Sequence, residues 1–314
     1  MKRRALLALF PSAALAFPER AITLVVPFAA GGSTDIAARL LAERLTGLLA
    51  TRVVVENRTG AGGALGSEAV KRAPADGHTL LFASASSHGA NPAVFRDLSY
   101  DAVADFAAVA LTGVTPLALA VPPGGARDVA GLRAQLADGR GAYGSAGAGS
   151  ITHLSSELFL QRAGLRADHI PYRGGAPALE ALARGEVPFA MDTLAGVAGL
   201  AADGRIRLLA LGTARPAPAY PQLPTLESQG LAPYDLSTWN AMLAPAGTPP
   251  DRVAALAQAV HAALAEPALA ARLAGLGVEV PPPTGPAATQ AFIAAEIAKF
   301  RAVADAAGLR LERP

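Results

Sequence analysis

Short apolar runs alternate with amphipathic segments along the first part of the chain. Residues 22–26, 52–56 and 80–83 are rich in apolar side chains, and these runs predict buried strands. Apolar positions at helical spacing predict helices over residues 36–49 and 64–72. Strands that alternate with helices in this way predict a parallel sheet with right-handed crossovers.

A second series of the same kind follows a Pro-Pro-Gly-Gly sequence at residues 122–125. Its predicted strands cover residues 142–145, 169–171, 187–191 and 208–211, and its predicted helices cover residues 129–137, 151–163, 176–184 and 194–202. The chain ends in predicted helices at 251–264, 267–276 and 286–307. The whole chain is therefore expected to be an α/β protein.

Two apolar runs, 116–121 and 236–243, separate the second series from the rest of the chain. If the chain enters a second lobe at the first run and returns at the second, two strands connect the lobes. Two-lobed binding proteins close about hinges of this kind. We therefore expect a discontinuous first lobe of residues 17–118 and 240–314, with the C-terminal helices, and a second lobe of residues 119–239.

The first sixteen residues have the pattern of a secretory signal. Three basic residues at positions 2–4 precede the short apolar stretch 5–15, and the sequence Ala-Leu-Ala that ends at Ala16 is a small-x-small cleavage site. A buried N-terminal helix is the alternative interpretation. The pattern favours cleavage near Ala16 and a soluble protein in a bacterial periplasm.

Charge and cysteine content narrow the class of protein further. Removing residues 1–16 leaves 24 Lys and Arg against 25 Asp and Glu, so the formal net charge changes from +2 to −1. The sequence has no basic run and only 5% aromatic residues, so nucleic acid is not an expected partner. The absence of cysteine excludes disulfides, thiolate metal sites, cysteine nucleophiles and a lipid-modified cysteine anchor.

The segment 27–35, PFAAGGSTD, joins the first predicted strand to the first predicted helix. Its small side chains leave backbone N–H groups accessible, and such groups at the start of a helix attract anions. Asp35 has two candidate roles there. It is either a first-turn acid favoured by the helix dipole, or a residue that holds the loop or reaches a ligand through water.

Four further loops follow predicted strands and are also rich in small or polar residues. They cover residues 84–89, 145–150, 172–175 and 192–193. Ligands of open α/β sheets bind beyond the carboxyl ends of the strands. Five such loops, divided between two lobes, predict a cleft for a small anionic ligand.

Other motifs give weaker signals. The glycines of residues 60–66 partly match a nucleotide-binding fingerprint, but four residues separate them from the preceding strand, and we interpret them as a structural turn. The histidines lack metal-ligand spacing and no Gly-x-Ser-x-Gly elbow is present, so no metal, cofactor or catalytic residue is expected. His88 is the best functional candidate among the histidines. Trp239, the only tryptophan, is expected in core or hinge packing, with ligand contact as the alternative.

Nine segments match the motifs of one known family in chain order. They are residues 25–35, 54–58, 60–63, 75–81, 91–92, 143–147, 171–174, 223–225 and 243–249. Together they resemble the Bug-type periplasmic solute receptors, the binding proteins of tripartite tricarboxylate transporters. The resemblance implies a type II periplasmic binding protein of the Venus-flytrap kind, in which each lobe is a mixed sheet flanked by helices and two strands form the hinge.

The resemblance also implies a set of residues that contact a small carboxylate through loop amides, hydroxyls and bridging waters. The implied first-lobe contacts are Ala29, Ala30, Gly31, Ser33, Thr34, Asp35, Ser84 and His88, and the implied second-lobe contacts are Ser145, Gly147, Ser150, Thr152, Arg173 and Asp192. Arg173 departs from the family pattern, in which lysine is frequent, and arginine offers a bidentate fork to a carboxylate. The loops 86–90 and 147–150 also depart from the pattern, so the ligand is not carried over.

The expected function is that of a monomeric receptor, not an enzyme, which delivers a small carboxylate to the membrane permease subunits of a tripartite tricarboxylate transporter. A ligand-sensing receptor that feeds a signalling partner is one alternative. A nucleotide-dependent oxidoreductase that uses residues 60–66, or a hydrolase with dispersed residues, is another. Plain amide loops accept dicarboxylates, tricarboxylates, amino acids and aromatic acids, so the sequence leaves the ligand open.

Overall fold

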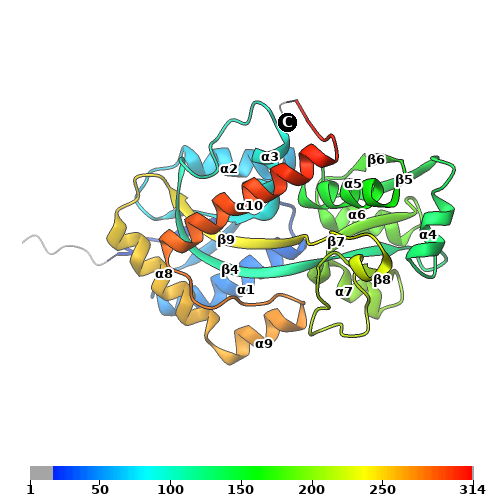
Figure 1. Ribbon diagram of the computed structural model, residues 1–314. Helices are drawn as coiled ribbons and strands as arrows, with labels where there is room; N and C mark the ends of the chain where they lie inside the picture. The colour runs from blue at the N-terminus through cyan, green and yellow to red at the C-terminus, as the bar shows by residue number, and fades with distance from the viewer. Residues whose placement is uncertain (1–16, 313–314) are drawn as a thin grey trace, which may run out of the picture.

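A mixed sheet runs through the computed structural model, which describes residues 17–312 (Figure 1). The predicted signal sequence and its cleavage site lie outside the described residues. The strands are β1 (Ile22–Val26), β2 (Val53–Asn57), β3 (Thr79–Ser84), β4 (Phe106–Val121), β5 (Gly141–Ser145), β6 (Ala167–Pro171), β7 (Phe189–Thr193), β8 (Arg207–Leu211) and β9 (Ser237–Pro245). Their order is β2-β1-β3-β9-β4-β7-β5-β6, and β8 pairs with β4.

Helices cover both faces of this sheet. They are α1 (Ser33–Leu48), α2 (Ala64–Lys71), α3 (Asn91–Val94), α4 (Val129–Gln135), α5 (Ile151–Ala163), α6 (Gly175–Ala183), α7 (Leu194–Ala202), α8 (Pro250–Leu264), α9 (Pro267–Gly275) and α10 (Pro286–Ala306), with the short turns η1 (Ala61–Gly63), η2 (Ser86–Ala90) and η3 (Glu227–Gln229). Within residues 17–312, no single helix is long and apolar enough to cross a membrane. Helices α8 and α9 pass that test only as a pair, and they are bent by 74° at the break between them.

The first lobe is built on β1, β2 and β3, which are parallel as predicted. Successive residues of β1 face opposite sides of the sheet. Leu24 and Val26 pack in a core with α1, α8 and α9, whereas Val25 packs in a core with α2, α3 and α10. In Figure 1 the first group of helices lies below the sheet and the second lies above it. Both faces of β1 and β3 are covered, which is why these two strands are mostly apolar.

The second lobe repeats this arrangement around β5, β6 and β7, which are also parallel. The last part of β4 and β8 complete its sheet in antiparallel pairing. Leu117 and Leu119 pack in a core with α4 and α5, whereas Ala118 and Ala120 pack in a core with α6 and α7. The α/β alternation predicted for both halves of the chain is therefore confirmed.

Two long antiparallel strands, β4 and β9, connect the lobes. Their register runs from Phe106 opposite Pro245 to Pro116 opposite Ser237. The predicted hinge runs lie within these strands, except for residue 236, which precedes β9, and the boundaries predicted inside them stay predictions. However, β4 begins ten residues before the apolar run at 116–121. Nearly every residue of that first part is buried between helices α8 and α10, so it lacks the alternation that marks a strand with one exposed face.

The segment between β3 and β4 is also more ordered than its sequence predicted. Residues 86–90 form the π-helical turn η2, and α3 follows directly. Small polar residues predict a loop there, but all five residues of η2 are buried. Tertiary packing against α10 and α5 has overridden the local preference.

Candidate functional site

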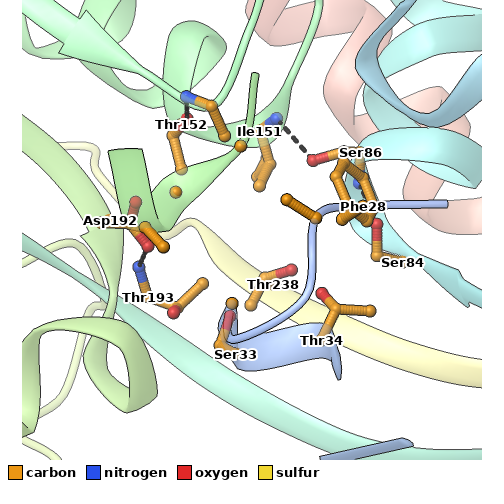
Figure 2. Close-up of a pocket in the computed structure, with 16 residues that line it drawn as sticks. Phe28, Ser33, Thr34, Ser84, Ser86, Ile151, Thr152, Asp192, Thr193 and Thr238 are labelled. Carbon is orange, nitrogen blue, oxygen red and sulfur yellow. Dashed lines mark hydrogen bonds between the residues drawn. The ribbon is translucent and has the colours of Figure 1, made fainter. Parts of the chain in front are cut away.

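A cavity lies between the lobes at the carboxyl ends of the parallel strands of both (Figure 2). We call it the inner cavity. Its lining consists of Phe28, Ala29, Gly32, Ser33, Thr34, Ser84, Ser86, Ala146, Ile151, Thr152, Gly174, Gly175, Ala176, Asp192, Thr193 and Thr238. Figure 2 shows Thr152, Asp192 and Thr193 of the second lobe facing Ser33, Thr34 and Ser84 of the first. Hydroxyl groups therefore dominate the polar surface of this cavity.

Two further spaces adjoin the inner cavity. The side cavity lies between the starts of α1, α6 and α7, and its lining includes Gly31, Ser33 and Asp192. The outer cavity lies toward the mouth of the cleft, between η1 and the loops after β5 and β6, and its lining includes Gly147 and Arg173. The cleft therefore extends beyond the inner cavity.

Four helices begin at the inner cavity. Helices α1 and α5 contribute Ser33 and Thr152 from their first turns, and α6 and α7 begin at Gly175 and just after Thr193. The starts of α1 and α6 follow glycine residues and have no side-chain cap. Their first N–H groups therefore lack a side-chain partner, and the positive ends of the helix dipoles face the cavity.

Asp35 fixes the loop that precedes α1. Its carboxylate accepts hydrogen bonds from the N–H of Gly31 at 2.9 Å, from Nε of Arg39 at 2.9 Å and from Nδ2 of Asn57 at 2.8 Å. The same Asn57 amide also donates to the carbonyl of Phe28 at 2.9 Å. Burial raises the pKa of Asp35, but these hydrogen bonds outweigh burial and hold it below its ordinary value. Asp35 therefore holds the loop, which is one of the roles predicted for it from the sequence.

The loop after β5 is held by a buried polar cluster. Ser150 caps α5 by accepting from the N–H of His153 at 3.2 Å, and Nδ1 of His153 accepts from the N–H of Gly149 at 3.1 Å. His169 stacks on His153 with ring centroids 3.8 Å apart, and its Nε2 lies 2.6 Å from the hydroxyl of Ser145. Burial lowers the pKa of His153 to about 3 and that of His169 to about 4, so both imidazoles are neutral near pH 7.

The two lobes touch across the cleft. The hydroxyl oxygen of Ser86 in the first lobe accepts a hydrogen bond of 3.0 Å from the N–H of Ile151, the first residue of α5. Gly62 of η1 lies so close to the second lobe that a Cβ there would sit 2.9 Å from the carbonyl oxygen of Ala148. The cleft is therefore bridged both by a hydrogen bond and by backbone contact.

The structure brings some of the predicted site residues together and leaves others apart. Six line the inner cavity: Ala29, Ser33, Thr34, Ser84, Thr152 and Asp192. Gly31 lines the side cavity, and Gly147 and Arg173 line the outer cavity. Five line none of these three spaces: Ala30, Asp35, His88, Ser145 and Ser150. Of these, Asp35, Ser145 and Ser150 hold the loops that do line the cleft, and Ala30 is exposed.

His88 lies behind the cleft. Its side chain is fully buried and packs against Tyr100 and Phe106, with ring centroids 5.5 and 4.6 Å away. Nδ1 lies 3.1 Å from the hydroxyl of Ser87, and burial lowers the pKa of His88 to about 3. The π-helical turn directs this ring into the first-lobe core. Its position is that of a neutral core histidine.

Several cavity residues had no part in the predicted set. Phe28, Ser86, Ile151, Thr193 and Thr238 line the inner cavity, as do glycines and alanines of the same loops. The loops 84–89 and 192–193 contain two of them, so loop position was a usable signal.

Thr238 precedes Trp239 on β9, and adjacent strand residues face opposite sides. Trp239 is buried and donates from Nε1 to Glu296 of α10 at 3.1 Å, which confirms its predicted packing role.

The glycines of residues 60–66 form a structural turn, as predicted. Gly62 and Gly63 have φ values of 60° and 96°, which favour glycine. A Cβ at Gly66 would lie 2.7–2.8 Å from Pro27 and from the carbonyl oxygen of Arg58. Close packing between η1, α2 and β1 therefore explains these residues. No group of three or more His, Asp or Glu residues within 17–312 has the arrangement of a metal site.

The chain is similar to known proteins in both sequence and structure. Residues 37–309 match the family described as "Tripartite tricarboxylate transporter family receptor". BugT of Bordetella pertussis is 33% identical over 306 residues, which cover 96% of this chain and 94% of that protein. These matches confirm the resemblance inferred from the motifs.

Two solved structures share the fold closely. R. palustris Rpa4515 with adipate is 36% identical, with a TM-score of 0.90 over 94% of this chain and 99% of its own. MatC (Rpa3494) from Rhodopseudomonas palustris with bound malate is 32% identical, with a TM-score of 0.87 over 91% and 99%. The predicted two-lobed binding-protein fold is thereby confirmed. The matched family is one of receptors, which favours a binding protein over an oxidoreductase or a hydrolase.

Proposed function

Because the chain belongs to the receptor family of tripartite tricarboxylate transporters, we propose that it binds a small organic carboxylate between its lobes and delivers it to the membrane permease subunits of such a transporter. The receptors of this family are periplasmic. We also propose that residues 1–16 direct export and that the exported chain begins at Phe17.

The observation that carries the proposal is the pair of uncapped helix starts, one from each lobe, at a single cavity. The first N–H groups of α1 and α6 lack side-chain caps, and hydroxyl side chains surround the same space. Such N–H groups bind carboxylates and other anions. Because α1 belongs to the first lobe and α6 to the second, a bound carboxylate would favour contact between the lobes.

Nine of the predicted residues remain in the proposed site. Ala29, Ser33, Thr34, Ser84, Thr152 and Asp192 would face the ligand in the inner cavity, with Gly31 beside them and Gly147 and Arg173 further out. Arg173 is exposed and would meet a second carboxylate at the outer end of a longer ligand. The relatives solved with adipate and malate both hold dicarboxylates, which supports this class of ligand.

A thermal-shift panel tests the binding part of the proposal. The panel contains succinate, malate, adipate, citrate, glutamate, nicotinate and benzoate. An acid present at 100 times its dissociation constant should stabilise the protein by about 2.7 kcal/mol. If none of these acids raises the unfolding temperature, the proposed ligand class is wrong.

A hydroxyl deletion tests the location of the site. Thr34→Val removes a cavity hydroxyl with little change of shape, and the affinity for the acid found by the panel should fall. Thr51→Val is the matched control, because Thr51 lies before β2 and lines none of the cavities described. Equal affinities of the two variants would place the ligand elsewhere.

Delivery is tested separately by uptake of the radiolabelled acid. Cells that lack this gene should lose high-affinity uptake, and wild-type protein should restore it better than Thr34→Val. Unchanged uptake by a protein that binds the acid tightly would remove the transport role and leave the receptor role. N-terminal sequencing of the exported protein should begin at Phe17.

A further inference from the structure

Asp192 is an unusual residue for a cavity that is proposed to hold an anion. It lies near the end of β7, its exposed fraction is 4%, and it lines both the inner and the side cavity. Among the described residues that line the inner cavity, it is the only one with a charged side chain. Arg173 lines only the outer cavity. A carboxylate in the inner cavity would therefore lie near another carboxyl group, with no cationic side chain between them.

Hydrogen bonds from the backbone and the side chain of Thr193 favour the ionised form of Asp192, but burial outweighs them. Its Oδ1 accepts from the N–H of Thr193 at 2.6 Å. A Cβ at Gly175 of α6 would lie 2.8 Å from Oδ2, and one at Gly196 of α7 would lie 3.0 Å from Oδ1, so the carboxyl group is packed between two helix starts. Burial is the main influence on the pKa of Asp192 and raises it to about 6.

Apart from the positive helix ends of α6 and α7, the elements around Asp192 supply almost no charge. On β4 its partner is Ala118, and α1 contributes Ser33 to the cavities that Asp192 lines. Glu180 of α6 also lines the side cavity, but it forms an ion pair with Arg205 at 2.7 Å. No nearby charge contributes to the shift at Asp192. A ligand carboxylate would thus be the strongest new charge that this group meets.

We propose that the cleft binds its carboxylate together with one proton, which Asp192 takes up and shares with the ligand. This inference rests on the proposed function. Asp192 and the ligand carboxylate each enter as anions, one proton comes from the solvent, and only an O–H bond forms. Two carboxyl groups that share a site hold one proton between them, because like charges at short distance disfavour double ionisation.

Proton uptake makes affinity depend on pH. Above about pH 6 the free protein has lost the proton that the complex retains. The dissociation constant should then rise about tenfold for each pH unit, or roughly 30-fold from pH 7.0 to 8.5. Succinate, malate and adipate are dianions over this range, so their own ionisation contributes little to the change.

The experiment is calorimetric titration of the wild-type protein with those three acids. At pH 7.5, titrations in phosphate and in Tris buffer differ in the heat of buffer ionisation, and this difference gives the number of protons bound. The result expected for each acid that binds is an uptake close to one proton. Binding with no proton uptake would overturn the inference and leave the proposed function standing. If no acid of the full panel binds wild-type protein at any pH, the proposed function itself fails.

Asp192→Asn provides the second arm. Asparagine is neutral at every pH tested and keeps an oxygen that accepts from Thr193. This variant should bind without proton uptake, its affinity should not vary between pH 7.0 and 8.5, and at pH 8.5 it should bind more tightly than wild type. Asp203→Asn is the matched control, because Asp203 is exposed at the end of α7 and its replacement changes the net charge equally. A wild-type pH dependence in Asp192→Asn would overturn the assignment, and the proton count on the wild type decides the question if this variant does not fold.

Discussion

Replacing Gly62 by alanine should separate folding from closure of the cleft. Gly62 lies in η1 with φ +60°, and a Cβ there would sit 2.9 Å from the carbonyl oxygen of Ala148 in the second lobe. That oxygen belongs to the backbone and cannot rotate away. The lobes would have to move apart by several tenths of an ångström, which weakens the hydrogen bond between Ser86 and Ile151.

Two costs follow, and they act on different states. A side chain in the left-handed backbone region costs about 1–2 kcal/mol, and this strain is present whether or not the lobes touch. Overpacking against Ala148 costs about 1–3 kcal/mol and arises only when the lobes touch, whereas the same Cβ would lie 3.0 Å from Oδ1 of Asn91 in the first lobe in either state. Because ligand binding is expected to depend on lobe contact, the second cost should weaken binding by about 5- to 150-fold.

The control for this variant is Gly139→Ala. Gly139 has φ +71°, and a Cβ there would have no atom within 4 Å, so only the backbone strain remains. Thermal unfolding without ligand should show a loss of stability for both variants, and a larger loss for Gly62→Ala because of its contact with Asn91. Calorimetric titration with the acid found by the panel should show weaker binding only for Gly62→Ala. If both variants bind equally well, the contact between η1 and the second lobe is absent from the bound form and the reasoning is wrong.

Three more variants test other features of the site. Asp35→Asn should lower the free energy of unfolding by about 1.5–3 kcal/mol at pH 7; because the pKa of Asp35 is held below 3.8, the difference should shrink in thermal melts as the pH falls below 4. The pKa of His153 is lowered from 6.5 to about 3, so between these pH values the unfolded chain binds more protons than the folded protein. When the pH falls from 7 to 5, the free energy of unfolding of wild type, measured with urea, should therefore decrease by roughly 1–2 kcal/mol more than that of His153→Gln. Ser86→Ala should weaken carboxylate binding about two- to tenfold in calorimetry, because it removes the bond to Ile151, and unchanged affinity would show that this bond does not form in the complex.

Periodicity and turn residues predicted most of the elements. The helices at 151–163 and 194–202 begin and end as predicted, since Ser150 and Thr193 supply recognisable caps. The first ten residues of β4 were missed because they are buried on both faces and show no alternation. Their strand character depends on α8 and α10, which follow more than 100 residues later in the chain.

The sequence predicted which loops line the candidate site, but it did not predict which of their side chains point into the cavity. The loop 84–89 contains both Ser86, which lines the cavity, and His88, which points into the core. A π-helical turn decides between the two, and nothing in a run of small polar residues specifies that turn. Thr238 lines the same cavity from a connecting strand, where reasoning from loops could not reach it.

The continuity of β4 has a consequence for how this protein can be divided. Its first part pairs with β9 and its last part pairs with β7 and β8, so no linker separates the lobes. A fragment cut at the predicted boundary, residues 119–239, would lose most of β4 and leave strand edges and apolar side chains unpaired. We therefore expect isolated lobes to aggregate and the intact chain to unfold in a single cooperative transition. A chimera that combines lobes from two relatives would have to exchange β4 and β9 as whole strands. The connecting strands therefore make recombination between the lobes difficult.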